Sequence, residues 1–340
     1  MNLGQIYEKA IQMGISKDPR GKAGIEVALD DARKEYDGLK GPDKKYFDKE
    51  RLRNPFADTR ILYGKEELEV RSLIAGVDVE VPELLLVDRL RQMGDTIDLC
   101  LAHHPEGRAL SQLSDVMALQ ADVWAATGVP INIGDALIAE RMGEIRRALM
   151  PQNHMRPVRT AELLKIPFMC VHTPADNQVT DFLTRLLKQK KPRTVGDLID
   201  VLLSVPEYTL AATRGMGPTV LVGDKKKRAG EPLVDMTGGT EGPSSMIEKL
   251  AQAGVGTIVA MHMGEALKKE AEKHHINVVI AGHIASDNIG LNLFLDQLVK
   301  GGVEVQTFSG LDRVSRLPQK ASQSKKPAKK PARKAAKKSR

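Results

Sequence analysis

The stretch SLIAGVDVEVPELLLVDRLRQMGDTIDLCLAH, residues 72–103, decides the fold class. It opens with a short apolar run over 72–79, typical of a buried strand, and closes with a second such run over 97–103. Between them Pro82 stands where the first turn of a helix tolerates proline, and apolar residues then recur at helical spacing up to Met93. A strand, a helix and a strand within about thirty residues predict a parallel β-α-β unit.

The same alternation continues toward the C-terminus. Further strands are expected at 166–172, 219–222, 256–262, 276–281 and 303–308, with helical patterns between most of them. Alternation of this kind predicts an α/β protein. The β-α-β regions around 70–172 and 219–308 predict two lobes that face one another.

The chain divides by composition into four segments. Residues 1–60 have apolar side chains at helical spacing, followed by a polar stretch, and are expected to form a helical N-terminal extension. A first α/β lobe with a helical insert is predicted over 61–215 and a second α/β lobe over 216–319. The tail over 320–340 is rich in Lys, Ala and Pro without an apolar anchor, so it is predicted to be disordered.

The charge of the chain is unevenly distributed. Its net charge of +7 comes from 51 Lys and Arg against 44 Asp and Glu in 340 residues. Ten of the basic residues and no acidic ones lie in 320–340, which leaves 41 basic and 44 acidic residues in 1–319. The body is therefore slightly acidic. The tail resembles those of linker histones, and we expect it either to bind nucleic acid through its phosphates or only to add solubility.

Two features bear on the cellular compartment. Cys100 and Cys170 lie 70 residues apart and offer no disulfide framework, which favours a reducing compartment. The N-terminal residues lack a signal-peptide pattern, and no apolar run approaches the ~18 residues of a membrane span. A cytoplasmic protein without membrane contact is expected, with the tail as a possible link to the nucleoid.

Histidines and aspartates follow three of the expected strands. His103 and His104 end the first, His172 and Asp176 follow the second, and His283 and Asp287 follow the third. Each has an ordinary explanation by itself: solvated imidazoles, a cap at Asp176 for a helix beginning near Gln178, or a first-turn acid at Asp287. Because the carboxyl ends of parallel strands are where ligands bind, the side chains are instead expected to meet in one cleft.

The expected cleft offers a defined set of metal ligands. Five of its side chains supply nitrogen or oxygen atoms: His103, His104, Asp176, His283 and Asp287. Five such ligands without a thiolate set are too many for one structural zinc ion. They suit two divalent ions that share a bridging carboxylate, and zinc, iron or manganese would each accept these ligands. Two divalent ions per chain are therefore the predicted cofactors.

Three motifs carry a family resemblance. The segments LCLAHHPE (99–106), HTPAD (172–176) and AGHIASD (281–287) are similar to the motifs of the Nif-three-like dinuclear metal-binding family, also described as the GTP cyclohydrolase I type 2 family. The resemblance covers roughly 66–310 and implies a two-lobed α/β fold, the same five metal ligands and a homohexamer. It also implies that His172 lies in the active site.

Two departures from the family pattern stand out. The family usually ends its last motif with Glu, whereas this chain has Asp287, which is one methylene shorter. The usual Thr-Gly-Glu turn is written Met263-Gly264-Glu265, and the histidines that often follow it are missing. We therefore expect that the metal centre is retained and that the part of the cleft that contacts the substrate is altered. His262, at the end of a strand near the cleft, is a weaker candidate for the site.

Three functions are open from the sequence. The first is a metal-dependent hydrolase that uses a metal-activated water, with His172 or Glu265 moving protons. The family description implies a nucleotide-like substrate, although the sequence shows no base-reading or ribose-reading motif. The second is a non-catalytic, metal-stabilised oligomeric scaffold or regulator. The third is a protein that its basic tail tethers to nucleic acid.

Overall fold

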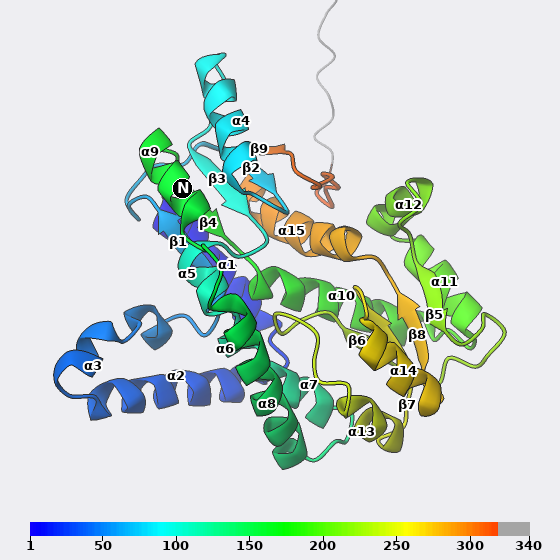
Figure 1. Cartoon of the computed structure of the whole chain (residues 1–340). Helices are drawn as coiled ribbons and strands as arrows, with labels where there is room; N and C mark the ends of the chain where they lie inside the picture. The colour runs from blue at the N-terminus through cyan, green and yellow to red at the C-terminus, as the bar shows by residue number, and fades with distance from the viewer. Residues whose placement is uncertain (319–340) are drawn as a thin grey trace, which may run out of the picture.

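Two β-sheets form the frame of the molecule in the computed structural model, which describes residues 1–318 (Figure 1). The strands are β1 (Arg60–Tyr63), β2 (Ser72–Gly76), β3 (Leu99–Ala102), β4 (Phe168–Cys170), β5 (Thr219–Val222), β6 (Glu231–Asp235), β7 (Val255–Ala260), β8 (Asn277–Ile280) and β9 (Glu304–Thr307). The first sheet has the order β1-β4-β3-β2-β9 and the second the order β5-β8-β7-β6. The predicted α/β class with two lobes is confirmed. The predicted tail lies outside the described residues.

Helices cover both sheets and fill the space between them. They are α1 (Leu3–Ser16), α2 (Gly21–Gly38), α3 (Gly41–Tyr46), the 3-10 helix η1 (Lys49–Leu52), α4 (Val81–Gln92), α5 (Gly107–Ser111), α6 (Leu113–Val116), α7 (Leu119–Ala125), α8 (Ile131–Leu149), α9 (Arg156–Leu164), α10 (Thr173–Lys190), α11 (Val195–Leu203), α12 (Pro206–Thr213), α13 (Met246–Gln252), α14 (Glu265–Lys273) and α15 (His283–Lys300). Helices α5 to α9 form the predicted insert between β3 and β4.

The β-α-β unit predicted over 72–103 is present. Strands β2 and β3 pair in parallel, with Leu73 opposite Leu99, and α4 connects them. Pro82 lies in the first turn of α4, where no backbone N–H is needed. Leu84 and Val87 of this helix are fully buried against the outer face of the first sheet. Local pattern and tertiary packing therefore agree in this segment.

Helices α10 and α15 lie between the two sheets and join the lobes. On one side Leu291 and Phe294 of α15 pack with residues of the first sheet. On the other side Ile289 of α15 and Val179 of α10 pack with residues of the second sheet. Because α15 is buried on both sides, it fixes the lobes relative to one another.

Strand β9 differs from the sequence expectation. Residues 303–308 were placed with the second lobe, but β9 pairs in parallel with β2 and closes the edge of the first sheet. The chain therefore leaves the second sheet after β8, runs along α15 and returns to the first sheet. Strand periodicity predicts that a segment is a strand, but it does not say which sheet has a free edge for it.

Two further features were not visible in the sequence pattern. The edge strands β1 and β5 pair antiparallel with β4 and β8, in sheets that are otherwise parallel. Helix α1, in the predicted N-terminal extension, buries Leu3, Ile6 and Ile11 completely in the first core. The N-terminal segment is thus an integral layer of the first lobe, and it brings the loop before β1 beside the end of β4.

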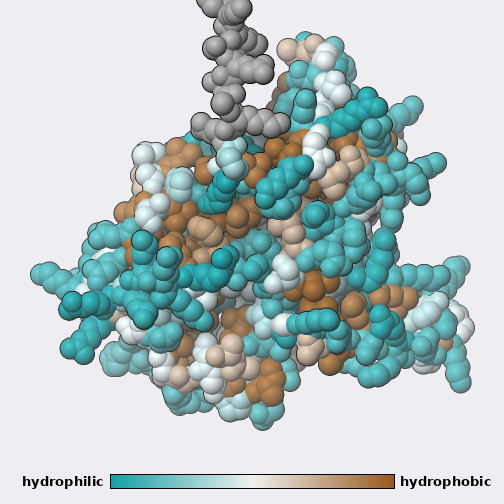
Figure 2. All heavy atoms as spheres, turned by 180° about the vertical axis from the view of Figure 1, so that it is seen from behind, coloured by the Kyte–Doolittle hydropathy of each residue, from teal (hydrophilic) through white to brown (hydrophobic). Residues whose placement is uncertain are grey.

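One face of the molecule is mostly polar. Seen from behind, hydrophilic residues dominate the surface, with apolar patches between them (Figure 2). Among the described residues, no helix is both long enough and apolar enough to cross a membrane.

Candidate metal centre

The ends of three strands position the candidate ligands. His103 and His104 follow β3, His172 lies just after β4, and Asp176 lies in the first turn of α10. Because α10 begins at Thr173 rather than near Gln178, the expectation that Asp176 caps the helix is wrong.

The third strand end requires a glycine. His283 begins α15, which follows β8 directly. Gly282 between them has φ +110°, and an added Cβ there would lie 2.9 Å from the backbone oxygen of Met216. Glycine therefore permits the sharp turn that places His283 and Asp287 at the cleft.

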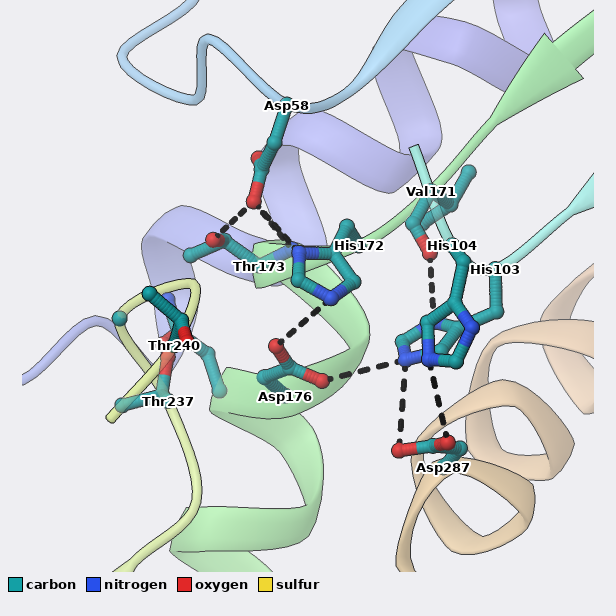
Figure 3. Close-up of polar contacts among 12 residues, drawn as sticks. Asp58, His103, His104, Val171, His172, Thr173, Asp176, Thr237, Thr240 and Asp287 are labelled. Atoms are coloured by element: carbon teal, nitrogen blue, oxygen red, sulfur yellow. Dashed lines mark hydrogen bonds and ion pairs between the residues drawn. The ribbon is translucent and has the colours of Figure 1, made fainter. Parts of the chain in front are cut away.

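The five predicted metal ligands lie together, with Asp287 at their centre. Figure 3 labels four of them, His103, His104, Asp176 and Asp287. Oδ1 of Asp287 lies 3.4 Å from Nε2 of His103, and its Oδ2 lies 3.6 Å from Nε2 of His104 and of His283. Asp176 Oδ1 lies 3.4 Å from His103 Nε2. Three overlapping groups of three side chains each bring their ligand atoms within 4.8 Å of one another. These groups could hold metal ions.

Hydrogen bonds at Nδ1 orient three of the imidazoles, and Figure 3 shows those of His103 and His172. Nδ1 of His103 lies 2.9 Å from the carbonyl oxygen of Val171, and Nδ1 of His104 lies 2.6 Å from Asp78 Oδ1. Nδ1 of His172 lies 2.8 Å from Asp58 Oδ2. Because each Nδ1–H donates to a fixed acceptor, the lone pair on Nε2 faces the centre, as metal-ligating histidines require.

Several buried atoms at this centre have no hydrogen-bond partner among the described residues. They are Nε2 of His103, Oδ1 of Asp176 and both carboxylate oxygens of Asp287. Their residues are 0%, 4% and 1% exposed. Burial without a partner costs free energy, and a divalent cation would satisfy all of these atoms at once. The donor set, imidazole nitrogen and carboxylate oxygen, fits such an ion.

Without a cation, charge pairing dominates the protonation of the centre. Burial lowers the pKa of His103, but the neighbouring carboxylates of Asp287 and Asp176 outweigh it and raise that pKa well above its usual value. Burial opposes ionisation of Asp287, yet the charge of His103 holds its pKa well below the usual range. A bound cation would take the place of these protons.

The structure places His172 at the centre, although the sequence predicted it only near the metals. Its Nε2 lies 3.8 Å from Asp176 Oδ2, and it forms one of the three potential metal-binding groups with His103 and His104. Its partner Asp58 comes from the loop before β1 and is fully buried. Nothing in the sequence pattern singled out Asp58, because its role depends on the antiparallel pairing of β1 with β4.

The structure does not bring Glu265 into this cluster. The residue begins α14, its side chain is 66% exposed, and its carboxylate lies 3.7 Å from Lys269 Nζ. His262 is closer: its ring centroid lies 5.0 Å from that of His283. His262 Nδ1 in turn lies 2.8 Å from Oε1 of Glu241, a residue that the sequence analysis missed.

A pocket of about 580 Å³, including the solvent at its mouth, adjoins the centre. Metal-centre residues form one side of it, and residues of the second lobe form the other. The lining consists of His172, Asp176, Asp235, Met236, Thr237, Gly239, Thr240, Glu241, Ala260, Met261, His262, Met263, Leu267, His283 and Asp287. The site is thus a buried ligand set that opens into a pocket.

Comparisons with known proteins bear on the fold. No family model and no curated protein matches the chain. Among solved structures, a NIF3 superfamily protein from Sphaerobacter thermophilus is 25% identical, with a TM-score of 0.65 over 84% of this chain and 98% of that chain.

Two other solved structures show a more distant likeness. Reduced HcgD from Methanocaldococcus jannaschii is 15% identical, with a TM-score of 0.44 over 73% of this chain and 87% of that chain. A Bacillus cereus protein related to NIF3 is 13% identical, with a TM-score of 0.39 over 78% and 92%. The conclusion rests on the Sphaerobacter protein alone: the chain has the fold of the NIF3 superfamily, and the family resemblance expected from its three motifs is confirmed.

Proposed function

We propose that this protein is a metal-dependent hydrolase with a centre of two divalent ions. The observation that carries the proposal is the convergence of buried, unpartnered ligand atoms from His103, Asp176 and Asp287 on one point beside a pocket. A set held together only for stability would be expected to satisfy these atoms with protein hydrogen bonds.

The chain offers enough ligands to hold two ions. His103, His104, Asp176, His283 and Asp287 supply them, and the two oxygens of Asp287 face different imidazoles. Divalent ions in such a centre would polarise a substrate oxygen and make a nucleophile available from water near neutral pH.

His172 is the residue best placed to move protons. Its Nδ1 is held by Asp58, so Nε2 faces Asp176 and the pocket. An imidazole fixed in one orientation by a buried carboxylate is suited to general acid–base work. Glu265, the other candidate from the sequence, lies outside the lining of the pocket.

Metal analysis of the full-length protein tests the proposal. About two divalent ions per chain are expected, and His283→Ala and Asp287→Ala should lose them. Hydrolysis of a panel of phosphoester, amide and cyclic amidine compounds should require added metal and vanish in His103→Ala and Asp176→Ala. His154→Ala is the matched control, because His154 is separate from the three potential metal-binding groups.

Two outcomes would contradict the proposal. A protein without bound metal under all loading conditions would remove its basis. The second outcome has two parts: the metal-site variants lose the oligomeric assembly, and the wild-type protein hydrolyses none of the compounds in a metal-dependent way. Together these results would favour a metal-stabilised scaffold instead of a hydrolase. Light scattering on the same samples measures the assembly, for which the family resemblance predicts a homohexamer.

A further inference from the structure

We propose that the pocket beside the metal centre carries a second recognition element, an acidic wall that binds an amidine or guanidine group. The acidic wall consists of Asp235, Glu241 and His262, which line the pocket. This inference rests on the proposed function, because it names a substrate class for the same site. It concerns residues outside the five predicted metal ligands.

Asp235 is the first part of the acidic wall. It ends strand β6, and its carboxylate is only partly exposed. Within residues 1–318 its side chain makes no hydrogen bond or ion pair with another side chain or with the backbone. Burial and the nearby charge of Glu241 raise the pKa of Asp235 to about 6. Two carboxylates therefore face the same space, and a ligand with N–H donors would relieve their repulsion.

Glu241 is the second part. Its Oε1 accepts hydrogen bonds from Nδ1 of His262, at 2.8 Å, and from the backbone N–H of Gly264, at 2.7 Å. Both bonds end on the same oxygen, so the position of the carboxylate is fixed. Oε2 has no hydrogen-bond donor among the described residues and stays available to a ligand. A carboxylate fixed in this way is preorganised to accept an N–H group of a ligand at Oε2.

Away from the metal ions, the pocket offers no permanently charged cationic side chain among the described residues. Its lining includes no lysine or arginine. The nearby Arg141 donates to the backbone oxygen of Glu241 and to the carboxylate of Glu144, and it lines a neighbouring pocket that Glu241 also lines. Like charges brought together in a closed site disfavour binding, so the acidic wall selects against a polyphosphate and in favour of a cation.

The remaining lining suits an apolar or planar body attached to that cation. Met261, Met263 and Leu267 offer apolar and polarizable contacts beside the acidic wall. Thr237 and Thr240 also line the pocket, and Figure 3 shows them on the same side of the site as His172 and Asp176. Amidines and guanidines present two parallel N–H donors, which match the two oxygens of the Asp235 carboxylate. A small cyclic or aromatic amidine fits the space, the charge and the donors together.

Three molecules of the same shape test the proposal: benzamidine, benzamide and benzoate. Their binding is measured by calorimetry on the full-length protein, loaded with metal and, separately, after chelation. We expect benzamidine to bind at least tenfold more tightly than benzamide. Asp235→Asn and Glu241→Gln should each weaken benzamidine binding about tenfold, with metal content unchanged. Glu248→Gln, an exposed charge change on α13, is the matched control.

The outcomes separate this proposal from the proposed function. Equal affinity for benzamidine in the wild type and in both wall variants, at equal metal content, overturns the acidic wall and leaves the metal centre standing. A protein that holds no metal, but whose benzamidine binding still depends on Asp235 and Glu241, supports the acidic wall and overturns the hydrolase. If Glu241→Gln disturbs the turn at Gly264, the near-isosteric Asp235→Asn decides the question alone.

Discussion

The carboxylate of Asp58 lies 2.8 Å from Nδ1 of His172 and 2.6 Å from Oγ1 of Thr173, in a fully buried position. This contact joins the segment before β1 to the residues that follow β4, which are 114 positions away along the chain. Burial opposes ionisation of Asp58, but the hydrogen bond from His172 outweighs it and holds its pKa below the usual value. Asp58 is therefore a charged acceptor that orients His172 toward the metal centre.

Replacement of Asp58 by Asn should slow metal-dependent hydrolysis about 10²–10⁴-fold, the usual contribution of a positioned proton-transfer group. The amide retains the size of the carboxylate but removes the charge that fixes His172. The metal content should stay unchanged, because His172 is not one of the five predicted ligands. Initial rates and metal analysis on the same samples measure both effects, and Asp37→Asn, on the exposed face of α2, is the control. Unchanged rates in Asp58→Asn would show that this carboxylate does not position His172 for proton transfer.

Substitutions at Asp287 test whether its shorter carboxylate fills the metal-binding role that a glutamate has in the Nif-three-like family. Both oxygens already reach imidazole nitrogens at 3.4–3.6 Å, and the residue is 1% exposed. Asp287→Asn should lose metal, since it removes the only charge shared by three histidines. Asp287→Glu should retain part of the metal but unfold about 1–3 kcal/mol more easily, because the extra methylene overpacks the site. Denaturant titrations and metal analysis check both; full metal content with wild-type stability in Asp287→Glu would contradict the packing argument.

Asp235→Asn should stabilise the protein above pH 6. The folded-state pKa of Asp235 is raised from 3.8 to about 6 by burial and by Glu241. Between these values the unfolded chain releases a proton that the folded chain keeps, so stability falls as the pH rises. The variant avoids this cost and should gain about 1–2 kcal/mol at pH 8, allowing for solvent screening, and nothing at pH 3. Urea unfolding of both proteins at the two pH values measures the gain in the free energy of unfolding. A gain that is equal at pH 3 and pH 8 would contradict the prediction.

Removal of the metal should lower the midpoint of thermal unfolding. An ion that binds only the folded state at 100 times its dissociation constant stabilises it by about 2.7 kcal/mol. Chelation should therefore shift the midpoint downward, and added zinc or manganese should restore it in a concentration-dependent way. The His103→Ala variant serves as the reference, because its midpoint should no longer respond to chelator. If neither chelator nor added metal changes the unfolding midpoint of the wild-type protein, the prediction of a bound ion is wrong.

Deletion of 320–340 should abolish salt-sensitive retention on DNA. The segment carries ten basic residues and no acidic ones, and each phosphate contact releases counterions. Metal content should be unchanged by the deletion, since all predicted ligands lie upstream. Retention on a DNA column across a salt gradient is the measurement. A truncated protein that is retained as strongly as the full chain would place nucleic-acid binding elsewhere.

The sequence was sufficient for the parts of the site that follow directly from a strand. The residues His103, His104, Asp176 and His283 lie at or within about four positions of a predicted strand end, and Asp287 lies one helical turn after His283. The structure gathers all five. For His103, His104 and Asp176 the reason is physical: β3 and β4 run parallel in the first sheet, so the residues after them emerge at one edge of that sheet. His283 and Asp287 follow β8 of the second sheet, and the packing of the two lobes brings them to the same place. The two-lobed α/β class followed from the same periodicity.

The partners of these residues depended on contacts between distant segments. Asp58 reaches His172 only because β1 pairs antiparallel with β4. Glu241 reaches His262 across a loop without periodic pattern, and Glu265, at a family-like turn, points into solvent instead. Such contacts depend on the direction and packing of whole elements.

The sequence by itself therefore determined which elements form and which side chains stand at their ends. Only the tertiary structure decided that β9 returns to the first sheet and that α15 lies between the lobes. Local propensity acts over a few neighbouring residues, whereas the choice of a sheet edge and of a buried face depends on the apolar surface that the whole chain must remove from water.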